Sequence, residues 1–247
     1  MPAKFKKALI VGADCETGRA VVLQLAGKGT DVIAVARVKG DLETLEQKYA
    51  NIAFQIGDGT CGMAKNLIAE TKPDLLVLAG GISPKSGTSY EKSWESFSDT
   101  YSSATRTAVE FLKAAIEVPL LPGSTVVTFS SNEAMSGCVR RGSYGGAQLK
   151  QHNLADYTAW EAERRGLGLR CFTIFPQQSS VRARPADMAS RIYSRPCAAT
   201  SEWLISPPNE TLTPNLMANR MTELVDINAG YSPGGWSISS QEMRSTL

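Results

Sequence analysis

The sequence predicts an α/β protein of three layers, in which a doubly wound parallel sheet lies between two layers of helices. Two observations predict this class: short β-rich runs alternate with longer helical patterns, and a glycine turn directly follows the first apolar run. In such a sheet, ligands bind at the carboxyl ends of the strands, where the strand order reverses. We therefore expect the functional residues to follow the strands.

The strands are runs rich in Val, Ile, Leu and Phe, bounded by Gly, Asp, Ser or Pro. In chain order they read KALIVG (7–12), DVIAVAR (31–37), IAFQIGD (52–58), DLLVLAGG (74–81), STVVTFSS (124–131) and LRCFTIFP (169–176). The helical patterns between them cover residues 19–28, 42–49, 63–71, 94–118 and 144–165. Further on, Met217, Met221 and Leu224 at helical spacing are typical of core positions.

The composition indicates one domain, residues 1–247, with 43% hydrophobic and 20% charged residues. A net charge of +2 with mixed signs argues against a nucleic-acid surface, and no apolar run reaches the ~18 residues of a membrane span. The apolar run before Gly12 is too short for a secretory signal, so a cytoplasmic protein is expected. Five cysteines without metal-ligand spacing fit reduced thiols and no metal site.

The turn after the first strand is typical of a phosphate-binding turn. Gly12 and Gly18 are six residues apart between a strand and a helix, the spacing that brings a backbone close to a dinucleotide pyrophosphate. Glu16 stands where a third glycine is expected. Its carboxylate would cost about 3 kcal/mol at ~5 Å from a phosphate and a dielectric of ~20, unless it turns outward. The alternative is that the nucleotide pocket has lost its function and stays empty.

Six features in chain order resemble the short-chain dehydrogenase/reductase family, over the chain to about Pro176. They are the glycine turn (Gly12, Gly18), Arg37 after the second strand, Asp58 after the third, the glycine pair that includes Gly80 after the fourth, Ser131 after the fifth, and Tyr144 thirteen residues later. The resemblance implies a Rossmann-type fold, a nicotinamide cofactor, and Ser131 and Tyr144 acting on a carbonyl or alcohol. It also implies that Asp58 meets the adenine amino group and that Gly80 and Pro176 border the cofactor.

The sequence departs from the family pattern near the expected chemistry. The family's lysine, four residues after Tyr144, is Gln148, and the family's catalytic Asn is missing. Lys150 is not a substitute, because six residues turn a helix by about 240° net, so its side chain points away from that of Tyr144. Pro176 is followed by Gln177 in place of the usual glycine.

Loss of the lysine affects the two directions of a redox reaction differently. An ammonium at ~4–5 Å would lower the tyrosine pKa by roughly two or three units at a dielectric of ~20, and Gln148 does not supply this charge. Tyr144 is then a poor general base but still a proton donor, which favours reduction. Gln148 can hydrogen-bond ribose hydroxyls, and Ser131 can orient a substrate oxygen. The alternative is that Ser131 and Tyr144 are evolutionary remnants that only contribute to packing.

The cofactor expected from the sequence is NADP(H). Arg37 offers a fork for a 2′-phosphate, and no acidic residue stands beside it in the sequence to favour a free ribose hydroxyl.

Four arginines suggest an anionic group on the substrate. Arg182 and Arg184 fall in the segment of about 178–215 that covers the substrate in this family, and Arg140 and Arg141 precede Tyr144. A solvated loop of mixed charge is the alternative for the later pair.

The helix that carries Tyr144 also suggests self-association. The family packs this helix against a partner copy, and here apolar residues decorate it, so a homodimer or homotetramer is expected. These residues are Leu149, Leu154, Tyr157 and Trp160.

Two function classes follow from these features. The first is an oxidoreductase that reduces a carbonyl or imine of a small organic substrate with NADPH, Tyr144 being the proton donor. The second is a non-redox cyclase or isomerase in specialised biosynthesis on the same scaffold, which the atypical active site around Gln148 keeps open. A non-catalytic member of the family is a third alternative.

Overall fold

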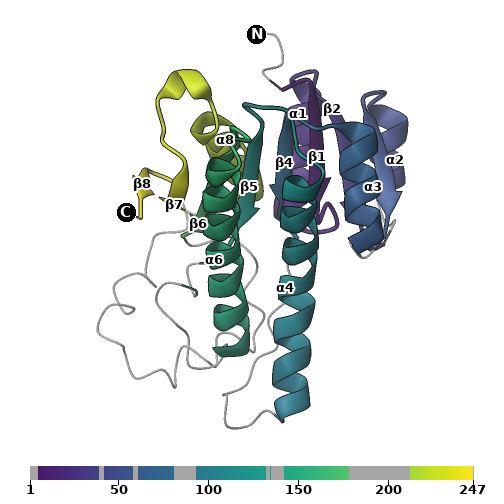
Figure 1. The fold of residues 1–247 in the computed structure, drawn as a ribbon. Helices are drawn as coiled ribbons and strands as arrows, with labels where there is room; N and C mark the ends of the chain where they lie inside the picture. The colour runs from purple at the N-terminus through teal and green to yellow at the C-terminus, as the bar shows by residue number, and fades with distance from the viewer. Residues whose placement is uncertain are drawn as a thin grey trace.

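The computed structural model describes residues 5–38, 42–57, 61–80, 93–131, 134, 142–177 and 212–246. Strands and helices alternate through most of the chain (Figure 1). The first half contains β1 (Lys7–Val11), α1 (Glu16–Gly27), β2 (Asp31–Ala36), α2 (Leu42–Lys48), β3 (Ile52–Ile56), α3 (Cys61–Thr71) and β4 (Leu75–Leu78). The second half contains α4 (Trp94–Glu117), β5 (Thr125–Phe129), α6 (Gly142–Arg164), β6 (Arg170–Pro176), α8 (Pro214–Leu224), η2 (Ile227–Ala229), β7 (Gly234–Ile238) and β8 (Met243–Ser245).

The strands form one eight-stranded sheet in the order β3-β2-β1-β4-β5-β6-β7-β8. All neighbouring pairs are parallel except β7 and β8, which are antiparallel. The chain moves outward from β1 to β3, then returns to the other side of β1 with β4. The strand order therefore reverses between β1 and β4, which is where ligands bind in sheets of this kind.

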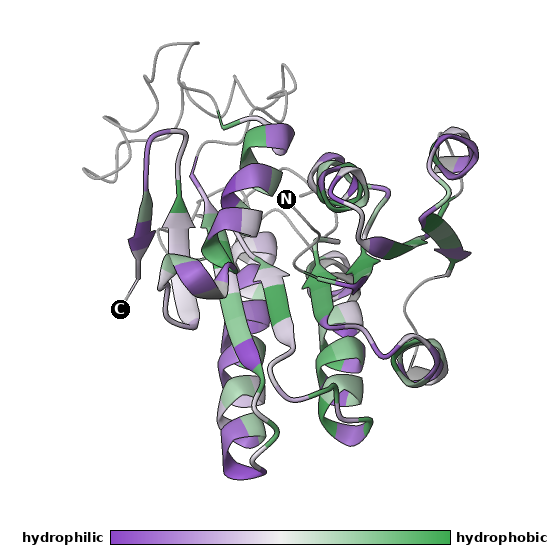
Figure 2. Cartoon of the chain, turned by 90° about the horizontal axis from the view of Figure 1, so that it is seen from above, coloured by the Kyte–Doolittle hydropathy of each residue, from purple (hydrophilic) through white to green (hydrophobic). Residues whose placement is uncertain are grey.

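Helices cover both faces of the sheet and form two hydrophobic cores. Helices α1, α2 and α8 contribute to one core, and α3 and α4 to the other. Along β1, Ala8 and Ile10 enter the first core and Leu9 and Val11 the second, because successive strand residues point to opposite faces. Figure 2 shows that the inner strands of the sheet are mostly hydrophobic, whereas the helices around them alternate between hydrophobic and hydrophilic residues. The predicted three-layer, doubly wound α/β fold is confirmed.

The structure refines the predicted boundaries. Helix α1 begins at Glu16, three residues before the predicted start, because the Cys15 side chain accepts a hydrogen bond from the Gly18 amide at 3.2 Å and caps the helix. Met217, Met221 and Leu224 lie in α8 and are buried, as predicted. The short edge strand β8 was not predicted. The expected covering segment lies outside the described residues up to position 211.

Candidate functional site

The glycine turn lies at the point where the strand order reverses. Gly12 follows β1 with φ +91°, and the amides of Gly12 and Ala13 both donate to the Val35 carbonyl on the neighbouring β2. A Cβ on Gly12 would lie 2.1 Å from the Gly80 Cα, after β4. Only glycine combines this backbone conformation with so close an approach. The turns after β1 and β4 therefore pack backbone against backbone.

The second glycine of the turn brings helix α1 against the same backbone. A Cβ on Gly18 would lie 2.2 Å from the carbonyl oxygen of Gly12, so a side chain there would separate the helix from the turn. The amides of Ala79 and Gly80 donate to the Val11 carbonyl, which fixes the turn after β4 beside β1. The structure thus brings Gly12, Gly18 and Gly80 together at the amino end of α1.

Cys15 caps α1 inside this turn. Its thiol donates to the Ala79 carbonyl at 3.3 Å and its sulfur accepts from the Gly18 amide. Burial raises the pKa of the Cys15 thiol, so the cap stays neutral at physiological pH. Glu16, the first residue of α1, is exposed.

These features fit the pyrophosphate of a dinucleotide. The amino end of a helix attracts an anion through its backbone amides and its dipole, and glycines let the backbone come close to the phosphates. The residues that would hold the pyrophosphate are those of the turn from Gly12 to Gly18. The neutral Cys15 cap adds no negative charge beside it.

Arg37 does not stand apart from acidic residues, contrary to the sequence prediction. Its Nε donates to Oδ2 of Asp14 at 3.1 Å. The Asp14 side chain is 12% exposed and that of Arg37 is 58% exposed. The contact was missed because the two residues are distant in sequence: β1 and β2 are adjacent and parallel, so the residues following each strand meet at the same edge.

The segments that carry the residues expected to act on the substrate are joined at the carboxyl end of β5. Ser131 lies just after β5, and Tyr144 lies in the first turn of α6. The hydroxyl of Ser130 donates to the backbone carbonyl of Gln148 at 3.1 Å, in a buried position. This hydrogen bond fixes α6 against the end of β5 and therefore holds the segments that carry Ser131 and Tyr144 together.

The two residues considered for the role of the family lysine lie in different environments. Gln148 is 3% exposed, so its side chain faces the protein interior. Lys150 is directed to the outer face of α6, where its Nζ lies 5.8 Å from the centre of the exposed Tyr157 ring. The prediction that Lys150 points away from the site is confirmed. A buried amide thus stands at the position expected for the family's lysine.

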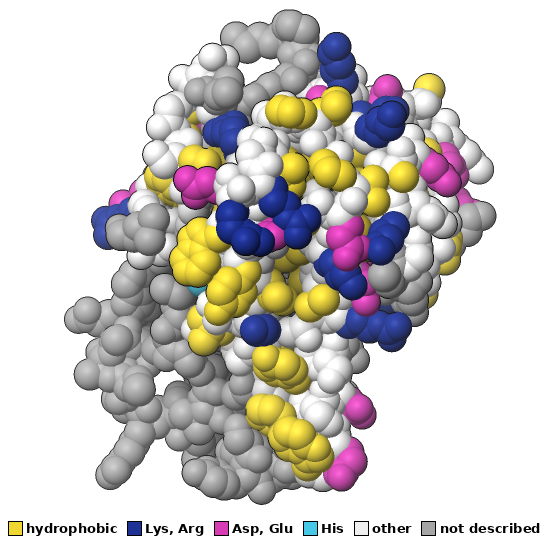
Figure 3. All heavy atoms as spheres, viewed as in Figure 1, with side chains coloured by type: hydrophobic (Ala, Val, Ile, Leu, Met, Phe, Trp, Pro, Cys, Tyr) yellow, Lys and Arg dark blue, Asp and Glu magenta, His cyan; other side chains and the backbone are white. Residues whose placement is uncertain are grey.

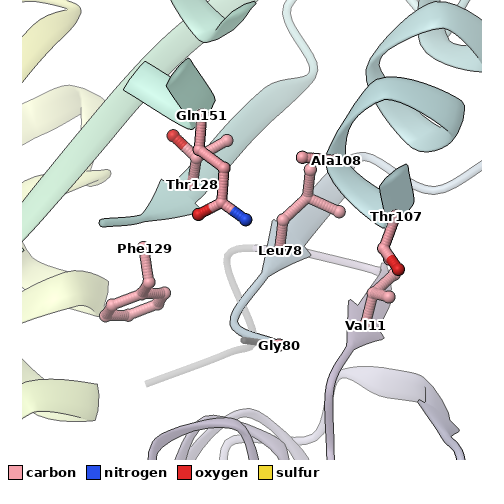
Figure 4. A pocket seen from close by; sticks show the side chains of 8 residues that line it. All are labelled: Val11, Leu78, Gly80, Thr107, Ala108, Thr128, Phe129 and Gln151. Carbon is pink, nitrogen blue, oxygen red and sulfur yellow. The ribbon is translucent and has the colours of Figure 1, made fainter. Parts of the chain in front are cut away.

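A small pocket opens among the ends of β1, β4 and β5 and the helices α4 and α6 (Figure 4). Its lining consists of Val11, Leu78, Gly80, Thr107, Ala108, Thr128, Phe129 and Gln151. Gln151 was missed by the sequence analysis. The available signal was its spacing: it follows Tyr144 by seven residues, which places both on one side of a helix. The Thr128 hydroxyl lies 3.0 Å from the Thr173 hydroxyl.

Gln177, which stands where the family usually has a glycine, directly follows the end of β6. Its backbone N–H donates to the Ile238 carbonyl at 2.7 Å, and its side-chain nitrogen donates to the Ser237 hydroxyl on β7. Pro176 is the last residue of β6 and pairs with Ile238. Gln177 therefore ties β6 to β7 next to the site.

Five predicted site residues lie outside the described residues. They are Asp58, Arg140, Arg141, Arg182 and Arg184. Within the described ranges, no three His, Cys, Asp or Glu side chains are grouped so that they could hold a metal ion. Among the helices that the structure describes, none is long and apolar enough to cross a membrane.

The fold, with its glycine turn at the reversal point, defines a Rossmann-type protein, and comparisons with known proteins agree. The model of the NAD dependent epimerase/dehydratase family matches residues 8–205, and the chain belongs to this family. A search of curated proteins found no match.

Solved structures of short-chain dehydrogenases/reductases share the fold, which confirms the resemblance seen in the sequence. An oxidoreductase of this family from Burkholderia thailandensis is 20% identical, with a TM-score of 0.72 over 95% of this chain and 91% of that one. A glucose/ribitol dehydrogenase-type member from Brucella melitensis is 16% identical, with a TM-score of 0.75 over 96% and 97% of the chains. A variant of the actinorhodin polyketide ketoreductase, crystallised with NADPH, is 18% identical, with a TM-score of 0.72 over 96% and 97%.

Proposed function

We propose that this protein uses NADPH to reduce a carbonyl or imine group of a small organic substrate. The observation that carries the proposal is the buried hydrogen bond from Ser130 to Gln148, which brings the segments of Ser131 and Tyr144 to the carboxyl edge of the sheet. The glycine turn lies at the same edge, after β1. The family model supports a nicotinamide cofactor, and the ketoreductase crystallised with NADPH shows this chemistry in a protein of the same fold.

The chain offers a group for each part of the cofactor. The turn from Gly12 to Gly18 would hold the pyrophosphate, Arg37 the 2′-phosphate and Gln148 the nicotinamide ribose. The bound cofactor supplies a hydride. Tyr144 donates a proton to the substrate oxygen or nitrogen, so the product is an alcohol or an amine. Ser131 orients the accepting atom through its hydroxyl.

Reduction is the favoured direction because the buried position next to Tyr144 holds an amide. An unperturbed tyrosine has a pKa of about 10 and is protonated at neutral pH, as a proton donor requires. Oxidation of an alcohol would need the tyrosinate, and Gln148 carries no charge that would stabilise it. The substrate proposed is one with an anionic group, which would be bound by the arginines that precede Tyr144 in the sequence and by those of the segment after β6.

We also propose a cytoplasmic homodimer or homotetramer. Helices α4 and α6 lie side by side in front of the sheet, and hydrophobic side chains gather on the face that they form (Figures 1 and 3). On α6, Leu149, Tyr157 and Trp160 are 41%, 55% and 66% exposed. Apolar surface of this kind is typical of protein interfaces. Free Cys15 and Cys171 fit a reducing compartment.

The test begins with binding of NADPH to the purified protein, measured by fluorescence and calorimetry. Turnover is then measured on a panel of ketones, imines and their alcohols. Tyr144→Phe is expected to abolish turnover and to leave the NADPH affinity within about twofold, since one hydroxyl distant from the phosphates is removed. Tyr157→Phe, on the outer face of the same helix, is the matched control and should turn over as the parent does.

Other outcomes separate the alternatives. A parent protein that binds NADPH but turns over none of the panel contradicts the reductase and favours a non-redox reaction such as cyclisation or isomerisation. A parent protein that binds no dinucleotide contradicts the reductase and favours a non-catalytic protein.

A further inference from the structure

One ion pair lies where the adenosine end of the cofactor is expected. Nε of Arg37 is 3.1 Å from Oδ2 of Asp14, and the two residues follow the adjacent strands β2 and β1. Arg37 is the cation that the proposed function assigns to the 2′-phosphate. Because an opposite charge is already in contact with it, its positive charge is partly neutralised before any cofactor binds.

The backbone of the glycine turn fixes the position of Asp14. The amides of Gly12 and Ala13 donate to the Val35 carbonyl at 2.9 Å, and the Cys15 amide donates to the Gly12 carbonyl at 3.1 Å. Asp14 lies between Ala13 and Cys15, whose backbone amides are held by these hydrogen bonds, and its side chain is only 12% exposed. The carboxylate is therefore preset, whereas the more exposed Arg37 side chain adjusts to it.

We propose that Asp14 is a specificity-determining residue that limits the preference for NADPH over NADH by holding the Arg37 guanidinium. This inference rests on the proposed function, because it assumes that a dinucleotide binds at the glycine turn. A 2′-phosphate must share Arg37 with the carboxylate and also meets the negative charge of Asp14. A cofactor with a free 2′-hydroxyl avoids both effects.

The experiment measures dissociation constants of NADPH and NADH by calorimetry, for the parent, Asp14→Asn, Arg37→Ala and the double variant. The shorter ligands 2′,5′-ADP and 5′-AMP are titrated as well, since they differ in the 2′-phosphate and lack the nicotinamide. Asp14→Asn keeps the size of the side chain and removes its charge. Asp31→Asn is the matched control, because Asp31 is an exposed acid at the opposite end of β2.

We expect Asp14→Asn to tighten NADPH and 2′,5′-ADP about fivefold, the factor that corresponds to ~1 kcal/mol, the upper end for an exposed ion pair. The dissociation constants of NADH and 5′-AMP should change by less than about twofold in the same variant. In the Arg37→Ala background the effect of Asp14→Asn should fall below about twofold, because the two residues act as a pair. Asp31→Asn should bind as the parent does.

Three results would overturn the inference. The first is an unchanged or lower NADPH preference in Asp14→Asn, which would mean that the carboxylate orients Arg37 for the phosphate. The second is an equal effect of Asp14→Asn with and without Arg37. The third is a higher preference that arises from weaker NADH binding alone. In each case dinucleotide binding itself persists. Absence of all dinucleotide binding, in the parent and in every variant, would instead refute the proposed function and this inference with it.

Discussion

Gly12→Ala is expected to destabilise the protein more than an alanine at another glycine with a positive φ. Gly12 has φ +91°, and the new Cβ would lie 2.1 Å from the Gly80 Cα and 2.2 Å from the Gly80 nitrogen. Both contacts are with backbone, so no side-chain rotation relieves them. The turn after β1 must move away from the turn after β4, at the reversal point of the sheet.

The expected cost has two parts. A non-glycine residue in a left-handed backbone conformation costs about 1–2 kcal/mol. Overpacking of a closely packed region costs a further ~1–3 kcal/mol. The sum of about 2–5 kcal/mol is a large fraction of a typical unfolding free energy of ~5–15 kcal/mol.

Two further variants separate these parts. Gly166 has φ +66°, and nothing lies within 4 Å of a Cβ built there. Gly166→Ala should therefore lower the free energy of unfolding by about 1–2 kcal/mol, through the backbone conformation alone. Gly80→Ala places a Cβ 3.0 Å from the Gly12 Cα, a milder overlap, and should lie between the other two. Urea unfolding followed by circular dichroism gives each free energy of unfolding. If Gly12→Ala costs no more than Gly166→Ala, the close backbone approach does not limit this position.

Three other predictions concern chemistry and assembly. Gln148→Lys is expected to lower the pKa of Tyr144 by roughly two or three units through a charge at ~4–5 Å, so alcohol oxidation should rise more than carbonyl reduction in steady-state assays; an unchanged ratio of the two rates would contradict this. Glu16→Gly should tighten NADPH binding in calorimetry, with a gain that shrinks at high salt, whereas weaker binding would mean that the carboxylate makes a needed contact. Trp160→Glu should convert an oligomer to a monomer in light scattering, while Lys48→Glu on α2 should not; a monomeric parent would argue against the interface on α6.

The sequence by itself determined the fold class and the local order of the site. Strands buried on both faces appear as continuous apolar runs, and their alternation with helical patterns leaves a doubly wound sheet as the consistent arrangement. The spacing of Tyr144, Gln148 and Lys150 already separated the buried amide from the ammonium on the outer face of the helix, because helical periodicity is a local property. The glycines of the turn were identifiable for the same reason.

Only the tertiary structure decided which distant groups meet. Asp14 pairs with Arg37, 23 positions away, and the Cys15 thiol reaches the Ala79 carbonyl, 64 positions away. The Ser130 hydroxyl is hydrogen-bonded to the backbone carbonyl of Gln148, 18 positions away, and this contact joins the end of β5 to α6. These contacts depend on which strands are adjacent and on how the helices cross the sheet, and both are set by packing of the whole chain. A local pattern therefore predicts that a charge is present, but not which group neutralises it.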